Sequence, residues 1–230
     1  MQWDLVQSTL PKLLAGVPLT LQLTFLSLTL GFVGAVGIAQ MRLSRSRLAS
    51  MIAYRFVYVF RGTPLLVQIF LIYYGLAQFE AVRDSVAWVV LREPYWCAII
   101  ALSLNSAAYG SEIVRGSILS VPAGQIEAAQ SQGMSGLLLF RRIIMPIALR
   151  QALPAYSNEM ILVVKATSLA SVVTLMEVTG IARAEVSRTF APYEIWTAAA
   201  ILYLTINFLI TRAVHALEWR LSPHMRAGRH

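Results

Sequence analysis

The stretch LLAGVPLTLQLTFLSLTLGFVGAVGIAQM, residues 13–41, contains no charged side chain. About 20 apolar residues in a helix are enough to cross the roughly 30 Å hydrocarbon core of a bilayer. The run therefore predicts a transmembrane helix. The composition agrees, since 57% of the 230 residues are hydrophobic and 13% are charged, whereas soluble domains carry roughly a quarter charged residues. We expect an all-α integral membrane protein that forms a single domain over residues 1–230.

Further apolar stretches predict the other spans, for about five in total, at residues 51–79, 95–119, 155–176 and 195–217. The second stretch contains Gly62 and Pro64, so we expect one long helix that bends there. A more polar loop, residues 121–154, separates the third and fourth spans. The sequence has no internal repeat of the kind found in self-contained secondary transporters. A pore built from this chain would therefore need a partner chain.

Basic residues are concentrated on one side of the predicted topology. Arg42, Arg45 and Arg47 follow the first span, and basic residues also exceed acidic ones in the loop after the third span and in the C-terminal tail. The loops 80–93 and 177–194 each contain one more acidic than basic residue. Because short loops rich in Lys and Arg stay in the cytoplasm, we expect the N-terminus outside and the C-terminus inside, with no removable signal peptide.

Several function classes have no support in the sequence. The net charge of +8 is explained by membrane topology, and we expect no nucleic-acid partner. Cys97 is the one cysteine and has no His or Cys at ligand spacing, so we expect no metal site. The chain also lacks the Gly-x-x-x-x-Gly-Lys-Ser/Thr loop that binds nucleotide phosphates. We therefore expect no catalytic residue and no cofactor on this chain.

The most informative pattern lies in the loop 121–154. It consists of an acidic residue and two alanines, a glycine after three more residues, and an isoleucine and a proline further on: Glu127, Ala128, Ala129, Gly133, Ile143 and Pro146. Local signals predict a short helix that ends before Gly133. They predict a second helix over residues 136–144, which Ser135 caps and Pro146 ends.

This pattern resembles the EAA loop of permease subunits of binding-protein-dependent ABC importers. The family pattern is EAA, three residues, Gly, nine residues and Ile-x-Leu-Pro; the chain departs from it at Met145, which is close to Leu in volume. Other matching residues are Arg61, Gly62, Thr63 and Pro64; Leu104, Asn105, Ala108, Tyr109 and Glu112; and Asn158, Glu159, Lys165, Thr167, Ser168 and Leu169. The likeness covers nearly the whole chain and is greatest to the polar amino acid uptake branch, in particular the M-type subunits for histidine, lysine and arginine and for octopine and nopaline.

The resemblance implies a role for the loop. Residues 127–133 would form a coupling helix that docks into a dimer of cytoplasmic ATPase subunits, which bind ATP and Mg. The chain would be half of a pore in the bacterial cytoplasmic (inner) membrane and would import a polar or basic amino acid, or an opine, by alternating access. Its other partners would be a second homologous permease or a second copy, and an extracytoplasmic substrate-binding protein. The alternative for the loop is an amphipathic hairpin that lies on the membrane surface.

Polar residues within the predicted spans are candidates for the transport path, because charges at bilayer depth usually face a cavity or a partner. Glu159 is the main candidate to hold a substrate cation. Candidates for hydrogen bonding to the substrate are Asn158, Thr167 and Asn105. A structural or gating role is expected for Arg61, Gly62, Thr63, Pro64, Glu112 and Lys165. The alternative is that Glu159 and Lys165 pair with other helices, at Arg61 or Glu112, and only fix the bundle.

Two further functions remain open at this point. An intramembrane enzyme could use Asn105, Glu112, Glu159 and Lys165 as a loose polar set. A passive channel for small polar solutes would need no ATPase. A tightly bound ATPase in the purified protein would decide between these functions and an ATP-driven importer.

Overall fold

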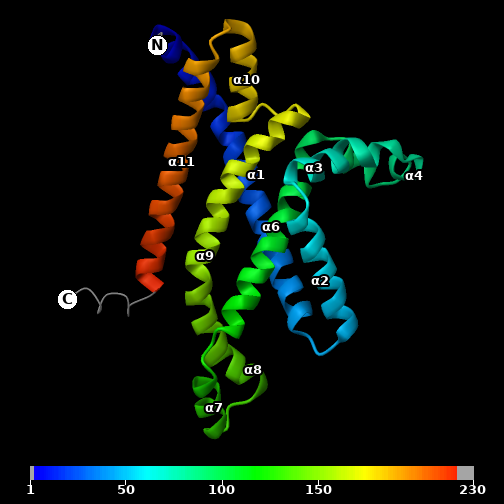
Figure 1. Ribbon diagram of the computed structural model, residues 1–230, viewed down its shortest axis with the longest axis vertical. Coiled ribbons are helices and arrows are strands. Elements are labelled where there is room, and N and C mark those ends of the chain that lie inside the picture. The colour runs from blue at the N-terminus through cyan, green and yellow to red at the C-terminus, as the bar shows by residue number, and fades with distance from the viewer. Residues whose placement is uncertain (1–2, 222–230) are drawn as a thin grey trace, which may run out of the picture.

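The uncharged run at residues 13–41 lies inside one long helix, α1 (Trp3–Leu43), which extends along much of the molecule (Figure 1). The computed structural model describes residues 3–221, and within this range it contains helices and connecting turns but no strand. Helix α1 begins well before the predicted span and passes through Pro11 and Pro18 without ending. Helices α7 and α8 form one end of the molecule, and α10 lies at the other (Figure 1).

The remaining elements follow in chain order. The helices are α2 Arg47–Gly62, α3 Leu65–Phe70, α4 Glu80–Arg83, α5 Trp88–Leu91, α6 Pro94–Leu119, α7 Ala123–Ser131, α8 Gly136–Leu139, α9 Met145–Ala166, α10 Val178–Thr189 and α11 Pro192–Leu221. Helices α1, α6 and α11 are each long and apolar enough to cross a membrane, and the described residues offer up to five spans if two bent pairs are counted as one span each. The expected all-α membrane fold is confirmed.

The first bent pair has the bend expected at Gly62 and Pro64, but the stretch 51–79 is two helical segments and not one long helix. Helix α2 ends at Gly62, and the helical segment Leu65–Gln78 continues at 105° to it. Between them Thr63 is extended, with φ −113° and ψ 144°, and Pro64 follows with φ −62° and ψ 132°. Proline disfavours the helical conformation in the residue before it and lacks an N–H to continue the ladder. The result is a sharp break between two helices.

The second correction concerns Pro146, which does not end a helix. The backbone is helical from Gly136 through Val173, so α8, a π-helical turn at Phe140–Ile144, α9 and a 3₁₀ segment at Thr167–Val173 follow one another directly. Pro146 lies in the first turn of α9, directly after the π turn. Proline is tolerated in a first turn, and an inserted π turn changes the local hydrogen-bond ladder. The segment expected to be a loop up to residue 154 is therefore mostly helical.

The loop expected at residues 177–194 also contains a helix, α10. Glu177 caps it, and its carboxylate accepts hydrogen bonds from the amide nitrogens of Thr179 at 2.9 Å and Gly180 at 2.8 Å. The hydroxyl of Tyr203 in α11 donates to the same carboxylate at 2.6 Å. Acidic residues are favoured at helix N-termini because they accept from otherwise unpaired amides.

Small residues allow α1 and α6 to pack closely. A Cβ atom on Gly31 would lie 2.9 Å from the Cβ of Ser106, and one on Gly110 would lie 3.0 Å from the Cβ of Ala35. Membrane helices associate through such small-residue contacts, because lipid provides no hydrophobic drive between helices. The α1–α6 pair forms the centre to which the other helices attach.

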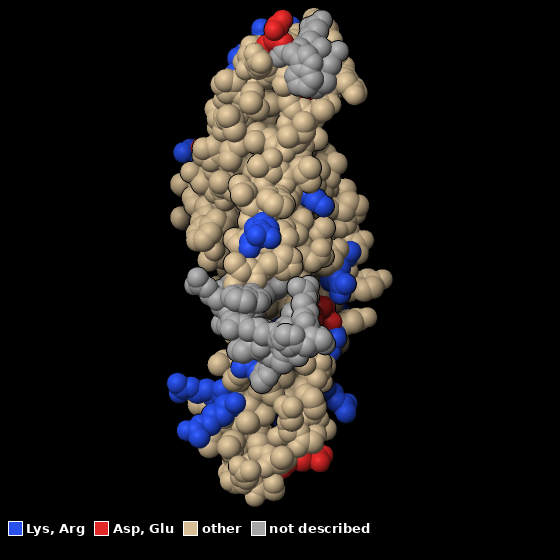
Figure 2. Space-filling view, turned by 90° about the vertical axis from the view of Figure 1, so that its left-hand side faces the viewer, with Lys and Arg blue, Asp and Glu red and all other residues tan. Residues whose placement is uncertain are grey.

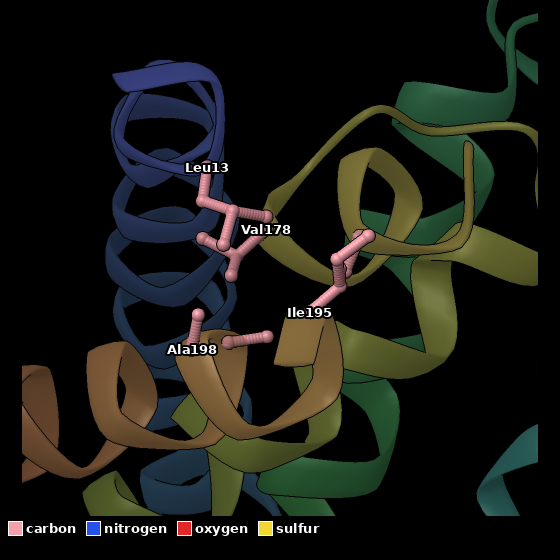
Figure 3. Close-up of a cluster of buried hydrophobic side chains, with 6 residues drawn as sticks. Leu13, Val178, Ile195 and Ala198 are labelled. Carbon is pink, nitrogen blue, oxygen red and sulfur yellow. The ribbon is translucent and has the colours of Figure 1, made fainter. Parts of the chain in front are cut away.

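A second contact holds α10 against α1 and α11 (Figure 3). Leu13 of α1 packs with Val178 of α10 and with Ile195 and Ala198 of α11, and all four are buried. Gly16 makes the approach possible, since a Cβ there would lie 2.7 Å from the backbone nitrogen of Val178. Helix α10 is thus attached to the end of the bundle that lies opposite α7 and α8.

Candidate functional site

The first candidate site is the α7–α8 segment, residues 122–146, which carries the EAA-like pattern. Helix α7 exposes Glu127 and Ala128, whereas Ala129 is buried against the segment itself. Exposed alanines permit another backbone to come close, and the Glu127 carboxylate is free to meet a basic group. Helix α7 therefore presents a small and an acidic side chain on its exposed face.

Gly133 ends α7 in a Schellman motif. Its amide donates to the Gln130 carbonyl at 2.9 Å, and the amide of Met134 donates to the Ala129 carbonyl at 3.0 Å. This pattern needs a left-handed residue, and Gly133 has φ +82°. No other atom lies within 4 Å of where its Cβ would be. Glycine is therefore required here by backbone conformation and not by lack of space.

The rest of the segment exposes apolar side chains. Leu137 is 79% exposed, and Leu138 and Phe140 beside it are also exposed. Ile143 and Pro146 are half-buried where the segment joins α9. Figure 2 shows Lys and Arg gathered near this end of the molecule, while charged groups on the long body above it are scattered. Apolar side chains and basic groups therefore lie together around α7.

The second candidate site is a cavity of about 190 Å³ between α3, α6 and α9. Its lining residues are Leu65, Leu102, Asn105, Tyr109, Glu159, Leu162, Val163 and Ala166. Two of the residues predicted for the transport path, Asn105 and Glu159, are brought together here. Glu159 is 5% exposed and forms no ion pair with any residue in the described range. Glu159 makes no direct ion pair, although the charge of the Arg61 guanidinium acts on it. A buried carboxylate that no cation contacts directly is suited to bind one.

A network of amides fixes one wall of this cavity. Gln68, which is buried, donates to the carbonyl oxygens of Phe60 at 2.9 Å and Thr63 at 3.1 Å, and to the Thr63 hydroxyl at 2.8 Å. Asn105 donates to the same Phe60 carbonyl and to the Gln68 side-chain oxygen, both at 3.2 Å. These bonds satisfy carbonyl groups that the break before Pro64 leaves without helical partners.

Gln68 was missed by the sequence analysis, although a signal was present. It is the one polar side chain between Leu65 and Phe70, four residues after a proline. A lone amide at such a position can satisfy backbone groups that the proline frees.

The other residues predicted for the path lie outside the cavity. Asn158 is on the exposed face of α9. Thr167 is fully buried and its hydroxyl donates to the Val164 carbonyl at 2.7 Å. Lys165 is exposed on the same face as Asn158 and makes no ion pair with any side chain that the structure describes. The two stripes of α9 are therefore distinct, one lining the cavity and one facing outward.

A wider groove of about 550 Å³ adjoins the cavity through Tyr109, which lines both. The Arg61 guanidinium lies over the Tyr109 ring, 5.0 Å from its centroid. Glu112 also lines this groove and pairs with Arg115 at 2.7 Å and Arg42 at 3.4 Å. Glu112 thus joins α6 to the end of α1 and does not pair with Lys165 or Arg61. Among the described residues, no group of three or more His, Cys, Asp or Glu is placed to hold a metal ion.

Known proteins resemble the chain over most of its length. Residues 13–223 match the family model of the binding-protein-dependent transport system inner membrane component. The chain is 56% identical to the nopaline transport system permease protein NocM of Agrobacterium fabrum, over 99% of this chain and 95% of that protein. It is 40% identical to the histidine/lysine/arginine/ornithine transport system permease protein HisM of Escherichia coli, over 92% of this chain and 89% of that protein. A crystal structure of an amino acid ABC transporter with histidines matches with a TM-score of 0.85 and 33% identity, over 96% of this chain and 98% of that chain.

Proposed function

Because the chain belongs to the family of binding-protein-dependent transport system inner membrane components, we propose that it is the permease subunit of an ABC importer for an opine or a basic amino acid. The family that the EAA-like loop indicated in the sequence is thereby confirmed. The choice of cargo is supported by two relatives, whose names specify nopaline and histidine, lysine, arginine or ornithine. The observation that carries the proposal is the cavity lined by Glu159, a buried carboxylate that forms no direct ion pair with any described residue.

Glu159 holds the cationic group of the cargo in this proposal. A charge pair in a site of low polarity is stronger than in water, so one buried carboxylate is enough to favour a cationic substrate. Asn105 lines the cavity beside it, and its amide nitrogen already donates to Phe60 and Gln68, so its side-chain oxygen is the group that can accept a hydrogen bond from the cargo. Arg61, over the Tyr109 ring, lines the adjoining groove and offers a carboxylate of the cargo a partner.

The α7–α8 segment couples transport to ATP hydrolysis. Helix α7 docks into a dimer of ATPase subunits, which hold ATP and Mg, with Glu127 and Ala128 at the contact. The helical connection from Gly136 through Val173 supports this role, since a displacement of the segment is passed along α9 to Glu159. Met145 and Glu159 are 14 residues apart in that helix, or about 21 Å at the helical rise. Such rigid-body motion is a common basis of alternating access.

The assembly that follows has a defined orientation. The α7–α8 segment faces the cytoplasm, and the N-terminus and α10 face outward, where an extracytoplasmic binding protein delivers the cargo. The exposed face of α9 with Asn158 and Lys165 lies toward a second permease subunit, because a lysine in contact with lipid costs roughly 2.5–3.5 kcal/mol. That subunit is a related chain or a second copy of this one.

Reconstitution tests the function directly. The protein is purified with the subunits that accompany it and placed in vesicles with its binding protein and ATP. We expect ATP-dependent accumulation of nopaline, octopine or arginine, in competition with one another. Accumulation without ATP would indicate a channel, and the absence of any co-purifying ATPase would contradict the proposal.

A further inference from the structure

An apolar groove of about 410 Å³ lies between α1, α2 and α6. Its lining residues are Leu30, Gly34, Ile38, Met41, Ile52, Ala53, Phe56, Ile100, Ser103, Leu104 and Ala107, all apolar except Ser103. The groove is open to the outside, since Leu30 and Ile52 are each 51% exposed. Gly34, Ala53 and Ala107 are small residues, one from each helix, and they form the floor of the groove between the larger residues at the edges of the groove.

The groove faces away from the transport path. In α6, Ile100, Leu104 and Ala107 line the groove, whereas Leu102, Asn105 and Tyr109 line the cavity of Glu159. At about 100° per residue these two sets fall on opposite sides of the helix.

Helix α2 shows the same division. Ile52 and Phe56 face the groove, and Tyr54, Tyr58 and Arg61 face the polar side. The α2–α6 pair thus separates a polar side of the molecule from an apolar side. A polar path and its partner subunit belong on the first side, and lipid belongs on the second.

The length of the groove matches one leaflet of a bilayer. Leu30 and Met41 are 11 positions apart in α1, or about 16 Å along the helix. Half of a hydrocarbon core is about 15 Å. The groove therefore extends from the membrane surface, where α1 ends, to about the middle of the membrane, which is the extent of one acyl chain.

Positive charge lies at the surface end of the groove. Arg45 and Arg47 flank the turn between α1 and α2, are exposed, and form no ion pair with any residue that the structure describes. Helix α2 begins between them, with Ser46 as its cap, and the free amides of its first turn add partial positive charge. An anionic head group would contact Arg45, Arg47 and the first-turn amides of α2, while its acyl chain would lie in the groove from Met41 toward Leu30.

We propose that this groove binds an anionic glycerophospholipid, with one acyl chain between α1, α2 and α6 and the phosphate at Arg45 and Arg47. The site joins α2 to α1 on the side opposite the cavity, and so steadies the helix that carries Arg61. A zwitterionic lipid with the same chains gains less at this site, because its head group carries no net charge.

Native mass spectrometry of the purified complex tests the site, with phosphatidylglycerol and phosphatidylcholine of identical acyl chains as probes. The wild-type protein retains phosphatidylglycerol preferentially. The double substitution Arg45→Gln/Arg47→Gln weakens its retention about 30-fold, which corresponds to about 1 kcal/mol for each arginine near a surface phosphate. Ile52→Trp fills the groove and also abolishes preferential retention. The control Arg83→Gln/Arg92→Gln removes the same charge at exposed positions away from the groove and leaves retention unchanged.

Three results would overturn the proposal. Equal retention of both lipids by the wild-type protein removes the role of the anionic head group. Loss of phosphatidylglycerol in the arginine variant but not in Ile52→Trp means that the groove holds no acyl chain. If Ile52→Trp changes the number of permease chains in the complex and leaves lipid retention unchanged, a protein subunit covers the groove.

Discussion

The side-chain amide of Gln68 donates a hydrogen bond of 2.9 Å to the backbone carbonyl of Phe60, across the break between α2 and α3. Asn105 of α6 donates to the same oxygen at 3.2 Å. The break is therefore held by two amides, one from the next helix and one from the helix on which the candidate cavity is built. The position of Leu65 in the cavity wall depends on this arrangement.

Gln68→Leu keeps a side chain of similar size and removes the donors to Phe60 and Thr63. We expect a loss of about 1–3 kcal/mol in stability, since buried carbonyls lose partners and bonds between membrane helices contribute up to about 2 kcal/mol each. Thermal unfolding of the purified protein measures the change. Gln78→Leu is the matched control, because Gln78 is exposed and, among the described residues, its side chain bonds to the Tyr74 carbonyl alone. Equal melting temperatures for the two variants would contradict the role of Gln68.

Gly133→Val separates the coupling role of the loop from its folding. The residue has φ +82°, where a side chain costs about 1–2 kcal/mol, so α7 loses its defined end. We expect the protein to insert and assemble normally but substrate-stimulated ATP hydrolysis to be lost. Gly124→Val provides the control, since Gly124 lies in α7 with equal free space and no positive φ. Stimulation that is unaffected in Gly133→Val would exclude the coupling role.

Gly31→Val tests the close packing of α1 and α6. Its new Cβ would lie 2.9 Å from the Cβ of Ser106, so the two helices must separate. We expect a loss of about 1–3 kcal/mol, the usual cost of overpacking. Gly37→Val in the same helix meets no atom within 4 Å and should leave stability unchanged. Thermal unfolding of both variants measures the loss. Equal melting temperatures would mean that helix propensity, and not the packing of α1 against α6, causes any loss of stability in Gly31→Val.

The sequence predicts the helical membrane fold well, because a long uncharged run such as residues 13–41 has few alternatives to a membrane helix. It also predicts the end of α7, because Gly133 is needed for a left-handed residue. The sequence does not predict which prolines end a helix. The helix axis turns by 105° at the break before Leu65, where Pro64 lies. Pro146, Pro11 and Pro18, in contrast, are accommodated within helical segments. The difference depends on tertiary partners such as Gln68 and on the π turn before Pro146, which local sequence does not specify.

The sequence also predicts the candidate site only in part, because it does not specify which face of α9 lines a cavity. The spacing in α9 separates Asn158 and Lys165 from Glu159 and Ala166, and the structure has these pairs on different faces. Spacing alone does not tell which pair faces a cavity. That depends on α3 and α6, which bring Leu65 and Asn105 next to Glu159. Thr167 was expected near the path from its place in the chain, but the 3₁₀ segment turns it into the core.

The central claim is that the carboxylate of Glu159 binds the cation of the cargo, and Glu159→Gln in the reconstituted complex tests it most directly. The substitution keeps the shape of the side chain and removes its charge, and a hydrogen bond to a charged group is worth roughly 1.5–3 kcal/mol. We predict at least about a tenfold drop in arginine or opine uptake, with normal assembly and basal ATP hydrolysis, while Glu80→Gln at an exposed position changes nothing. Wild-type uptake by Glu159→Gln would contradict the claim and leave Glu159 as a structural residue of the bundle.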